Sequence, residues 1–333
     1  MASLSDYKVL IGFPIYQGAL EWLEQRVTVL GPGAVSNDEY MALLAQAHAV
    51  ILSGRQFGAV EMDAAPALQV IGRYGAGIDN VDVAAATERG LPVVYAPYGP
   101  TESTAEHAVL LIMAAARRLA FFDRAARQAN FGLQSRPELM GMELEGKALG
   151  VVGYGRIGQR VAEICRDGLH MQVRVFDPFR DAESIAACGD ACVTDLMELA
   201  RAVDVLTVHS PLTSETHHLI SRDVIRAMRP GAILVNASRG PVVDEQALIE
   251  ALQDGHLWAA GLDVFDPEPP MPDNPLLKMD NVVATPHIGS FTEDGRRKMG
   301  MTVAQDVLCV LTGEYPQYLA NPEVWGRRRR AAA

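Results

Sequence analysis

The chain has 333 residues, 49% of them hydrophobic and 21% charged, so it is long enough to form two buried cores. Its formal net charge of -12 argues against a broad basic face of the kind that binds nucleic acid or an anionic membrane. Four cysteines are too few for a disulfide framework and match no common zinc spacing, so we expect no metal site.

The first residues, MASLSDYKVLIG, contain no charged leader followed by a sustained apolar run, and no later stretch has the length of a membrane span. We therefore expect a cytoplasmic protein. Between residues 8 and 95, the short apolar runs KVLIG, VTVL, AVILS, LQVIG and PVVY alternate with helix-like stretches. This alternation predicts parallel strands joined by helices, and so a first doubly wound, flavodoxin-like domain.

A long connecting helix is predicted next, because Ser103 to Glu106 form an S-x-x-E capping box ahead of the run AVLLIMAAA. A second series of apolar runs follows, starting at residues 148, 173, 203, 232, 260 and 281. Six such strands with intervening helices fit a Rossmann sheet, whose strands are apolar throughout because helices cover both faces.

Residues 291–312 look helical again, although Gly295 and Gly300 weaken that prediction. If this helix packs back on the first domain, that domain is discontinuous. We therefore expect an α/β protein with two doubly wound parallel-sheet domains around a cleft. The predicted substrate-binding domain comprises residues 1–99 and 291–333, and the predicted NAD-binding Rossmann domain comprises residues 100–290.

A glycine motif, GYGRIG at residues 153–158, follows a predicted strand and opens a predicted helix. Gly153 permits a tight turn, Gly155 lets backbone amides approach a pyrophosphate, and Gly158 permits close packing of helix on strand. The helix N-terminus adds partial positive charge. The motif, with Arg156 and Ile157 opening the helix, predicts a dinucleotide site.

Asp177 ends the next predicted strand about 20 residues beyond the motif, where a carboxylate accepts hydrogen bonds from ribose hydroxyls. The same carboxylate would repel a 2′-phosphate and favours NAD over NADP, a preference that Arg174 and Arg180 nearby make less strict. Asp263, at the end of the fifth strand, could hold the nicotinamide carboxamide or cap a helix or loop. Other candidate cofactor-binding residues are Ser210, Pro211, Ala237, Ser238 and Gly289.

Three polar residues follow successive predicted strands: Arg239 in VNASRG, Glu268 in DVFDPEPP and His287 in ATPHIGS. Each alone could be a surface or capping residue. Together they suit the oxidation of a 2-hydroxy acid, which needs a cation for the carboxylate, a base for the hydroxyl proton and an orienter for that base. The planar guanidinium of Arg239 can form two parallel hydrogen bonds with a carboxylate. Histidine exchanges protons near neutrality, so His287 is the candidate base, and Glu268 would fix its tautomer.

Six motifs in order resemble those of the D-isomer-specific 2-hydroxyacid dehydrogenase family: GRYGAGIDNVD (72–82), GYGRIG, VNASRGPVVDEQAL, GLDVFDPEPP, NPLL and ATPHIGS. The resemblance implies an NAD-dependent enzyme that passes hydride to and from a small 2-hydroxy or 2-keto acid, and a homodimer built on the nucleotide-binding domains. It implies that Arg239, Glu268 and His287 are the catalytic trio and that Asp263 faces the nicotinamide. It also assigns the substrate carboxylate to the backbone amides of Gly75, Ala76 and Gly77.

The first motif is similar to the phosphoglycerate dehydrogenase branch, in which Arg55 of ILSGRQ would occupy the place of an anion-contacting arginine and Arg73 could add a second cation. Surface salt bridges explain both arginines nearly as well. The chain ends soon after ANPEVW, without room for the regulatory domain of longer phosphoglycerate enzymes, so hydroxypyruvate, glyoxylate and 3-phosphoglycerate stay open as substrates. An NAD-sensing interaction protein, like the family's corepressor branch, is the alternative function, because an intact site does not prove turnover.

Overall fold

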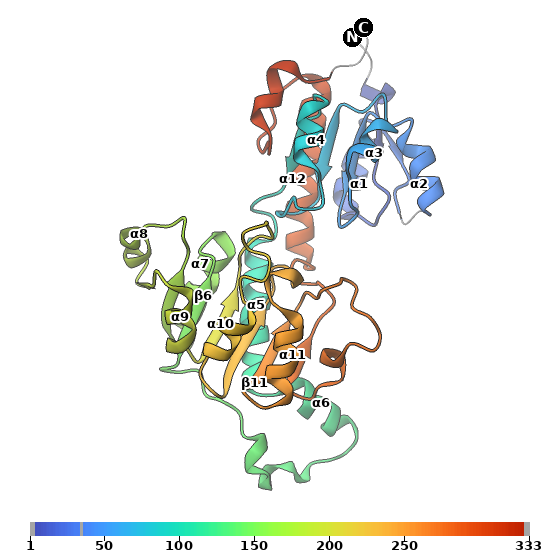
Figure 1. The fold of residues 1–333 in the computed structure, drawn as a ribbon. Coiled ribbons are helices and arrows are strands. Elements are labelled where there is room, and N and C mark those ends of the chain that lie inside the picture. Colours follow the sequence, from blue (N-terminus) through green and yellow to red (C-terminus); the bar gives the residue numbers. More distant parts are fainter. Residues whose placement is uncertain (1–3, 34–35, 330–333) are drawn as a thin grey trace. The chain divides into compact units, whose positions relative to one another are not determined.

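The chain forms two compact units in the computed structural model, which describes residues 4–33 and 36–329 (Figure 1). One unit consists of Met1–Pro100 and Phe291–Ala333, and the other consists of Thr101–Ser290. Each unit contains one parallel sheet flanked by helices, as the alternating apolar runs predict. Within the described residues, no helix has both the length and the apolar character needed to cross a membrane.

The first unit contains a five-stranded parallel sheet in the order β2-β1-β3-β4-β5. This is the flavodoxin-like order, and the five strands coincide with the five predicted apolar runs. The two central strands, β3 and β4, are buried almost throughout because helices cover both faces of the sheet. The strands are β1 (Lys8–Leu10), β2 (Thr28–Leu30), β3 (Ala49–Leu52), β4 (Val70–Arg73) and β5 (Val93–Tyr95), and the helices are α1 (Gln17–Glu24), α2 (Asn37–Leu44), α3 (Ala59–Asp63), α4 (Val83–Glu88) and α12 (Glu293–Thr312).

The last long helix, α12, packs against β4 and α1 of the first unit. Two glycines allow this close approach. A Cβ atom on Gly72 of β4 would lie 2.7 Å from Val303 on α12, and a Cβ atom on Gly300 would lie 3.1 Å from Ala19 on α1. Gly300 therefore serves helix packing, and its presence does not end the helix.

The second unit contains a seven-stranded parallel sheet in the order β12-β11-β10-β9-β6-β7-β8. The six strands β6 to β11 have the Rossmann order, and β12 extends the sheet beyond β11. The prediction missed only β8, an edge strand of two residues. The strands are β6 (Ala148–Val152), β7 (Gln172–Phe176), β8 (Ala191–Cys192), β9 (Val205–Val208), β10 (Ala232–Asn236), β11 (Leu257–Leu262) and β12 (Val282–Ala284), and the helices are α5 (Thr101–Ala116), α6 (Leu119–Arg127), α7 (Arg156–Glu163), α8 (Ala182–Ala187), α9 (Leu196–Ala202), α10 (Arg222–Ala227) and α11 (Glu245–Gln253).

The helix α5 begins at Thr101, three residues before Thr104, where a helix with Ser103 as its N-cap would begin. Ser103 and Glu106 therefore lie inside the helix, and Ser103 is buried, so the capping-box prediction was wrong. The apolar stripe of α5 packs on β10 and β11, which is why the chain continues as a helix through these residues.

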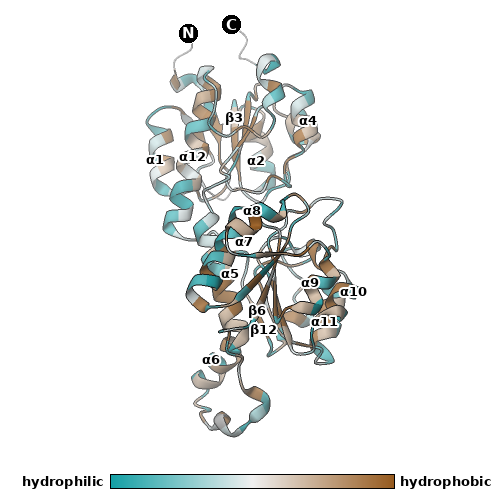
Figure 2. Cartoon of the chain, turned by 90° about the vertical axis from the view of Figure 1, so that its left-hand side faces the viewer, coloured by the Kyte–Doolittle hydropathy of each residue, from teal (hydrophilic) through white to brown (hydrophobic). Residues whose placement is uncertain are grey.

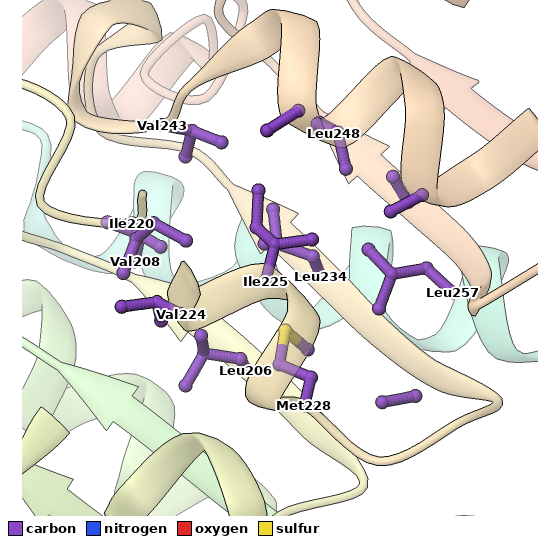
Figure 3. Close-up of a cluster of buried hydrophobic side chains, with 14 of the residues drawn as sticks. Leu206, Val208, Ile220, Val224, Ile225, Met228, Leu234, Val243, Leu248 and Leu257 are labelled. Carbon is purple, nitrogen blue, oxygen red and sulfur yellow. The ribbon is translucent and has the colours of Figure 1, made fainter. Parts of the chain in front are cut away.

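Helices α10 and α11 cover the opposite face of this sheet, and apolar side chains fill the space between these helices and the strands (Figure 3). Leu206 and Leu234 on the strands and Ile225 and Leu248 on the helices are at most 1% exposed. Burial of each such side chain contributes about 1.5 to 3 kcal/mol to stability. Figure 2 shows the same pattern as hydrophobic strands enclosed by helices with hydrophilic outer faces. This packing fixes the ends of the strands, where the predicted polar residues lie.

Candidate functional site

The strand order of the second sheet reverses between β6 and β9. Open α/β sheets bind ligands beside the carboxyl ends of the strands at such a switch point. Gly153, after β6, has a φ of +89°, and a Cβ atom on it would lie 2.9 Å from the carbonyl of His209 and from the backbone nitrogen of Ser210, after β9. The backbones of the two loops are therefore in direct contact. This contact joins the glycine motif to the segment of Ser210, two candidate parts of the site that the sequence does not link.

The other two glycines of the motif have different surroundings. Gly155 is the N-cap of α7, and a Cβ atom on it would meet nothing within 4 Å. A Cβ atom on Gly158 would collide with the carbonyl oxygen of Gly153. Gly158 thus permits close packing, whereas Gly155 leaves open space in front of the first turn of α7. The first-turn amides of a helix have no intrahelical acceptor and attract anions.

Asp177 follows β7 and ties the glycine loop to this strand. Its Oδ2 accepts a hydrogen bond of 2.6 Å from the amide of Tyr154, and its Oδ1 accepts one of 2.8 Å from the amide of Phe179. A carboxylate has about four acceptor sites, so capacity remains for ribose hydroxyls. The hydroxyl of Tyr154 donates to the buried Asp190, which also pairs with Arg166 at 2.8 Å. The loop is thereby held at two points.

His209 was not among the predicted site residues, although it ends the predicted run VDVLTVH just before Ser210. Its Nε2 lies 3.0 Å from the hydroxyl of Thr207, and its buried Nδ1 has no hydrogen-bond partner in the described part of the chain. Burial lowers the pKa of His209 to about 4, so the ring is neutral at pH 7. A buried nitrogen without a partner, beside the glycine loop, fits a site that a bound polar group completes. The glycine loop, Asp177 and His209 together suit a dinucleotide.

Arg239 follows β10 on a segment held by Asn236, a residue that the prediction did not include. The Asn236 side chain is 1% exposed. Its Oδ1 accepts hydrogen bonds from the amide and hydroxyl of Ser238, and its Nδ2 donates to the carbonyl of Arg239 at 2.9 Å. The guanidinium of Arg239 is half-buried and donates to the carbonyl of Ser238 at 2.8 Å. Arg239 thus projects from a rigid segment that also contains Ala237.

Glu268 and His287 meet, as predicted, although they lie on the separate loops that follow β11 and β12. The distance from Nδ1 of His287 to Oε1 of Glu268 is 2.5 Å. Their side chains are 44% and 39% exposed, so a substrate can reach them. Within residues 4–33 and 36–329, no partner is found for Nε2 of His287. The carboxylate therefore orients the ring by one nitrogen, and the proton-transfer role of the other nitrogen stays a prediction.

Asp263 lies just after β11 and is 1% exposed. Its Oδ1 accepts from the Thr285 hydroxyl at 2.6 Å and from the Ile288 amide at 2.9 Å, and its Oδ2 accepts from the Gly289 amide at 2.8 Å. Burial raises the pKa of Asp263, but hydrogen bonds from His107, Thr285 and the two amides outweigh burial and hold the pKa below its ordinary value. Asp263 thus fixes the segment that carries His287, and its contact with the nicotinamide stays a prediction.

The loop after β4 in the first unit carries the predicted substrate amides. Gly75 has a φ of +146°, and its amide donates to the carbonyl of Arg73 at 2.9 Å. Among the described residues, the amides of Ala76 and Gly77 have no such acceptor. The guanidinium of Arg73 lies directly under Gly75, and its Nε donates to the buried Asn80 at 3.0 Å. Arg73 therefore supports the loop, and the contact of a substrate carboxylate with the amides of Ala76 and Gly77 stays a prediction.

Arg55 lies on the neighbouring loop after β3, and the same Asn80 donates to its carbonyl at 2.7 Å. The guanidinium of Arg55 stacks over the ring of Tyr40 at 4.0 Å and donates to Asn37 at 2.8 Å. No acidic side chain pairs with it within the described residues, so the surface salt bridge considered for Arg55 is not found. Its charge is fixed in place without being neutralised.

In the described part of the chain, no three His, Cys, Asp or Glu side chains are placed so that they could hold a metal ion.

The chain is similar to proteins of one known family. The model of the D-isomer specific 2-hydroxyacid dehydrogenase NAD binding domain matches residues 109–289. D-3-phosphoglycerate dehydrogenase from Archaeoglobus fulgidus is 42% identical over 92% of this chain and 58% of its own length. Glyoxylate reductase from Korarchaeum cryptofilum is 42% identical over 79% of each chain. The chain thus spans about three fifths of the phosphoglycerate dehydrogenases and a larger share of the glyoxylate reductase.

Solved structures of similar fold are also found. The TT0316 protein from Thermus thermophilus superposes with a TM-score of 0.87 at 37% identity, covering 94% of this chain and 99% of that chain. An NADPH-dependent glyoxylate/hydroxypyruvate reductase from Sinorhizobium meliloti, solved with NADP and malonate, gives a TM-score of 0.85 at 29% identity and covers 98% and 100%. With the family model matching more than half of the residues, the chain belongs to the D-isomer specific 2-hydroxyacid dehydrogenase family.

Proposed function

We propose that the chain is an NAD-dependent D-2-hydroxyacid dehydrogenase that reduces a small 2-keto acid and oxidises the matching 2-hydroxy acid. The observation that carries this proposal is the 2.5 Å contact between His287 and Glu268 at the edge that also holds Arg239 and the glycine loop. The curated relatives named above are dehydrogenases and reductases, so we do not propose the NAD-sensing alternative.

Each polar residue has one task in this reaction. The glycine loop and Asp177 would hold the dinucleotide, which would supply the hydride. Arg239 binds the carboxylate with its planar guanidinium and polarises the neighbouring carbonyl. His287 gives a proton from Nε2 to the carbonyl oxygen during reduction and takes it back during oxidation, while Glu268 holds Nδ1 and stabilises the charged ring.

An NADH-oxidation screen tests the proposal. The full chain is assayed with glyoxylate, hydroxypyruvate, phosphohydroxypyruvate and pyruvate, and with 2-oxoisovalerate as a branched ketoacid. We expect turnover of at least one short polar ketoacid, on the order of 1 to 10³ per second as is typical of enzymes. NADH binding without turnover of any of these acids would contradict the dehydrogenase assignment.

We further propose that Arg55 contacts an anionic group distal to the carboxylate, as in a 3-phosphorylated ketoacid. Its guanidinium is oriented by Tyr40 and Asn37 yet has no acidic partner among the described residues, which leaves donors for a phosphate. Arg55→Ala should then lower kcat/KM for phosphohydroxypyruvate about 10-fold or more and leave glyoxylate within about twofold. An equal loss on both substrates would exclude a distal-anion role.

We also propose that the chain forms a homodimer. The segment from Arg117 to Gly141 includes α6 and lies outside the layers of its unit (Figure 1). It exposes Leu119, Phe131 and Met140 at 52%, 68% and 69%, and an exposed apolar cluster of this kind marks an association surface. We infer that a second copy covers it. Light scattering should give twice the mass of the chain, and Phe131→Asp should shift it toward the monomer mass, whereas Phe179→Asp, at an exposed residue elsewhere, should not.

The cytoplasmic location stays a prediction from the sequence, and fractionation of the producing cells tests it.

A further inference from the structure

His107 lies on α5, beneath the segment that carries His287. Its side chain is 11% exposed, and its Nε2 lies 3.2 Å from Oδ1 of Asp263 and 3.0 Å from the hydroxyl of Thr285. The Thr285 hydroxyl has one proton, which it gives to the Asp263 carboxylate at 2.6 Å. Because both neighbours of Nε2 then act as acceptors toward it, Nε2 carries a proton and donates to both.

Asp263 and Thr285 hold the backbone around His287. The amide of His287 donates to the Asp263 carbonyl at 2.8 Å, and the next two amides donate to the Asp263 carboxylate. His287 itself has a φ of +54°, a left-handed conformation that a residue other than glycine keeps only when its surroundings hold it. The conformation that aims His287 at Glu268 is therefore maintained by bonds made to Asp263.

The segment also rests directly on α5. A Cβ atom on Gly289 would lie 3.0 Å from Oδ2 of Asp263, 3.4 Å from Thr104 and 3.7 Å from the His107 ring. Gly289 has no side chain of its own, so its backbone lies directly against the side chains of Thr104 and His107. A change in the hydrogen bonding of His107 is consequently passed to the His287 segment without an intervening flexible group.

We propose that His107 is a positioning residue, whose Nε2 proton holds Asp263 and Thr285 together and so keeps His287 in the orientation that bonds Glu268. This inference rests on the proposed dehydrogenase function. It assigns His107 no contact with substrate or cofactor. It predicts that losing the donor lowers kcat while the binding of NADH is kept.

The test compares His107→Leu, which removes the donor at similar volume, with His107→Gln, whose Nε2 can replace it. Glu106→Gln, at an exposed residue of the same helix, is the matched control. With NADH and the ketoacid that wild type reduces fastest, His107→Leu should lower kcat about 10-fold or more, as expected when a reacting group is misplaced. KM for NADH should stay within about twofold, and His107→Gln should recover kcat to within about threefold of wild type.

A second readout does not depend on activity. In protein labelled with 15N-histidine, the proton of His287 Nδ1 bonded to Glu268 gives a downfield signal, assigned by its loss in His287→Asn. We expect this signal to shift upfield or broaden in His107→Leu and to return in His107→Gln. If His107→Leu does not fold, His107→Asn, whose amide is too short, takes its place against His107→Gln.

The outcomes separate the two claims. A wild-type chain that reduces no ketoacid contradicts the proposed function. The NMR signal of His287 still tests whether His107 positions His287, because it does not depend on activity. Wild-type kcat and an unchanged His287 signal in His107→Leu overturn the inference. So does an equal loss in His107→Leu and His107→Gln, because packing alone would then explain the effect.

Discussion

The two glycines at the start of α7 should respond differently to the same substitution. Gly158→Ala places a methyl group against the Gly153 carbonyl oxygen and 3.3 Å from Val151, so α7 must move away from β6. Overpacking of this kind costs about 1 to 3 kcal/mol, which lowers Tm by roughly 2 to 4 °C per kcal/mol in a unit of this size. Gly155→Ala meets no atom within 4 Å and has a φ of -75°, which alanine adopts freely.

Thermal unfolding and NADH titration of both variants test this contrast. Gly155→Ala loses only the small N-cap preference of glycine over alanine, below about 1 kcal/mol, so its Tm should stay close to that of wild type. Its methyl group would occupy the open space in front of the helix and should weaken NADH binding about 10-fold, or 1.4 kcal/mol. Wild-type NADH affinity in a folded Gly155→Ala would refute a pyrophosphate site at this helix.

Three other substitutions test the remaining assignments. Asp177→Ser should reduce the ratio of kcat/KM with NADH to kcat/KM with NADPH. Equal kcat/KM with the two cofactors in wild type would show that Asp177 does not determine the choice of cofactor. Arg239→Lys keeps a positive charge but loses the planar fork, so kcat/KM should fall about 10-fold or more for every ketoacid, which steady-state rates on two substrates check. The pKa of His209 in the folded chain, about 4, lies below the ordinary 6.5. Below pH 6.5 the unfolded chain therefore binds a proton that the folded chain does not, and the free energy of unfolding falls as the pH decreases. The loss between pH 7.5 and 5 is about 2 kcal/mol, and urea unfolding of His209→Gln should show a smaller decline.

Much of the fold is predictable from the sequence because parallel strands covered on both faces are continuous apolar runs. The five runs of the first unit and six of the seven strands of the second follow from that signal. The strand β8 gives no such signal, because Ala191 and Cys192 alone form it at the edge of the sheet. The start of α5 was misplaced because a capping-box spacing at Ser103 occurs inside a helix that begins at Thr101.

The site is predictable in part for the same reason. Polar residues that directly follow strands must gather at one edge of the sheet, which is why the sequence points to Arg239, Glu268 and His287. Residues that act through long-range contacts give no local signal. His107 lies 178 positions from Thr285, and no spacing rule links them before the fold is known. Asn80 likewise connects the loops of Arg55 and Arg73 only in three dimensions.

The substitution His287→Asn tests the proton-transfer role of His287. Asparagine tolerates the left-handed backbone found at this position, φ +54°, so the substitution removes the ring without forcing the segment to rearrange. The measurement is kcat for NADH-dependent reduction of the ketoacid that wild type turns over fastest, with NADH affinity measured in parallel. We expect a loss of about 100-fold or more in kcat with NADH affinity within about twofold of wild type. A folded His287→Asn whose kcat stays within about threefold of wild type would contradict this role.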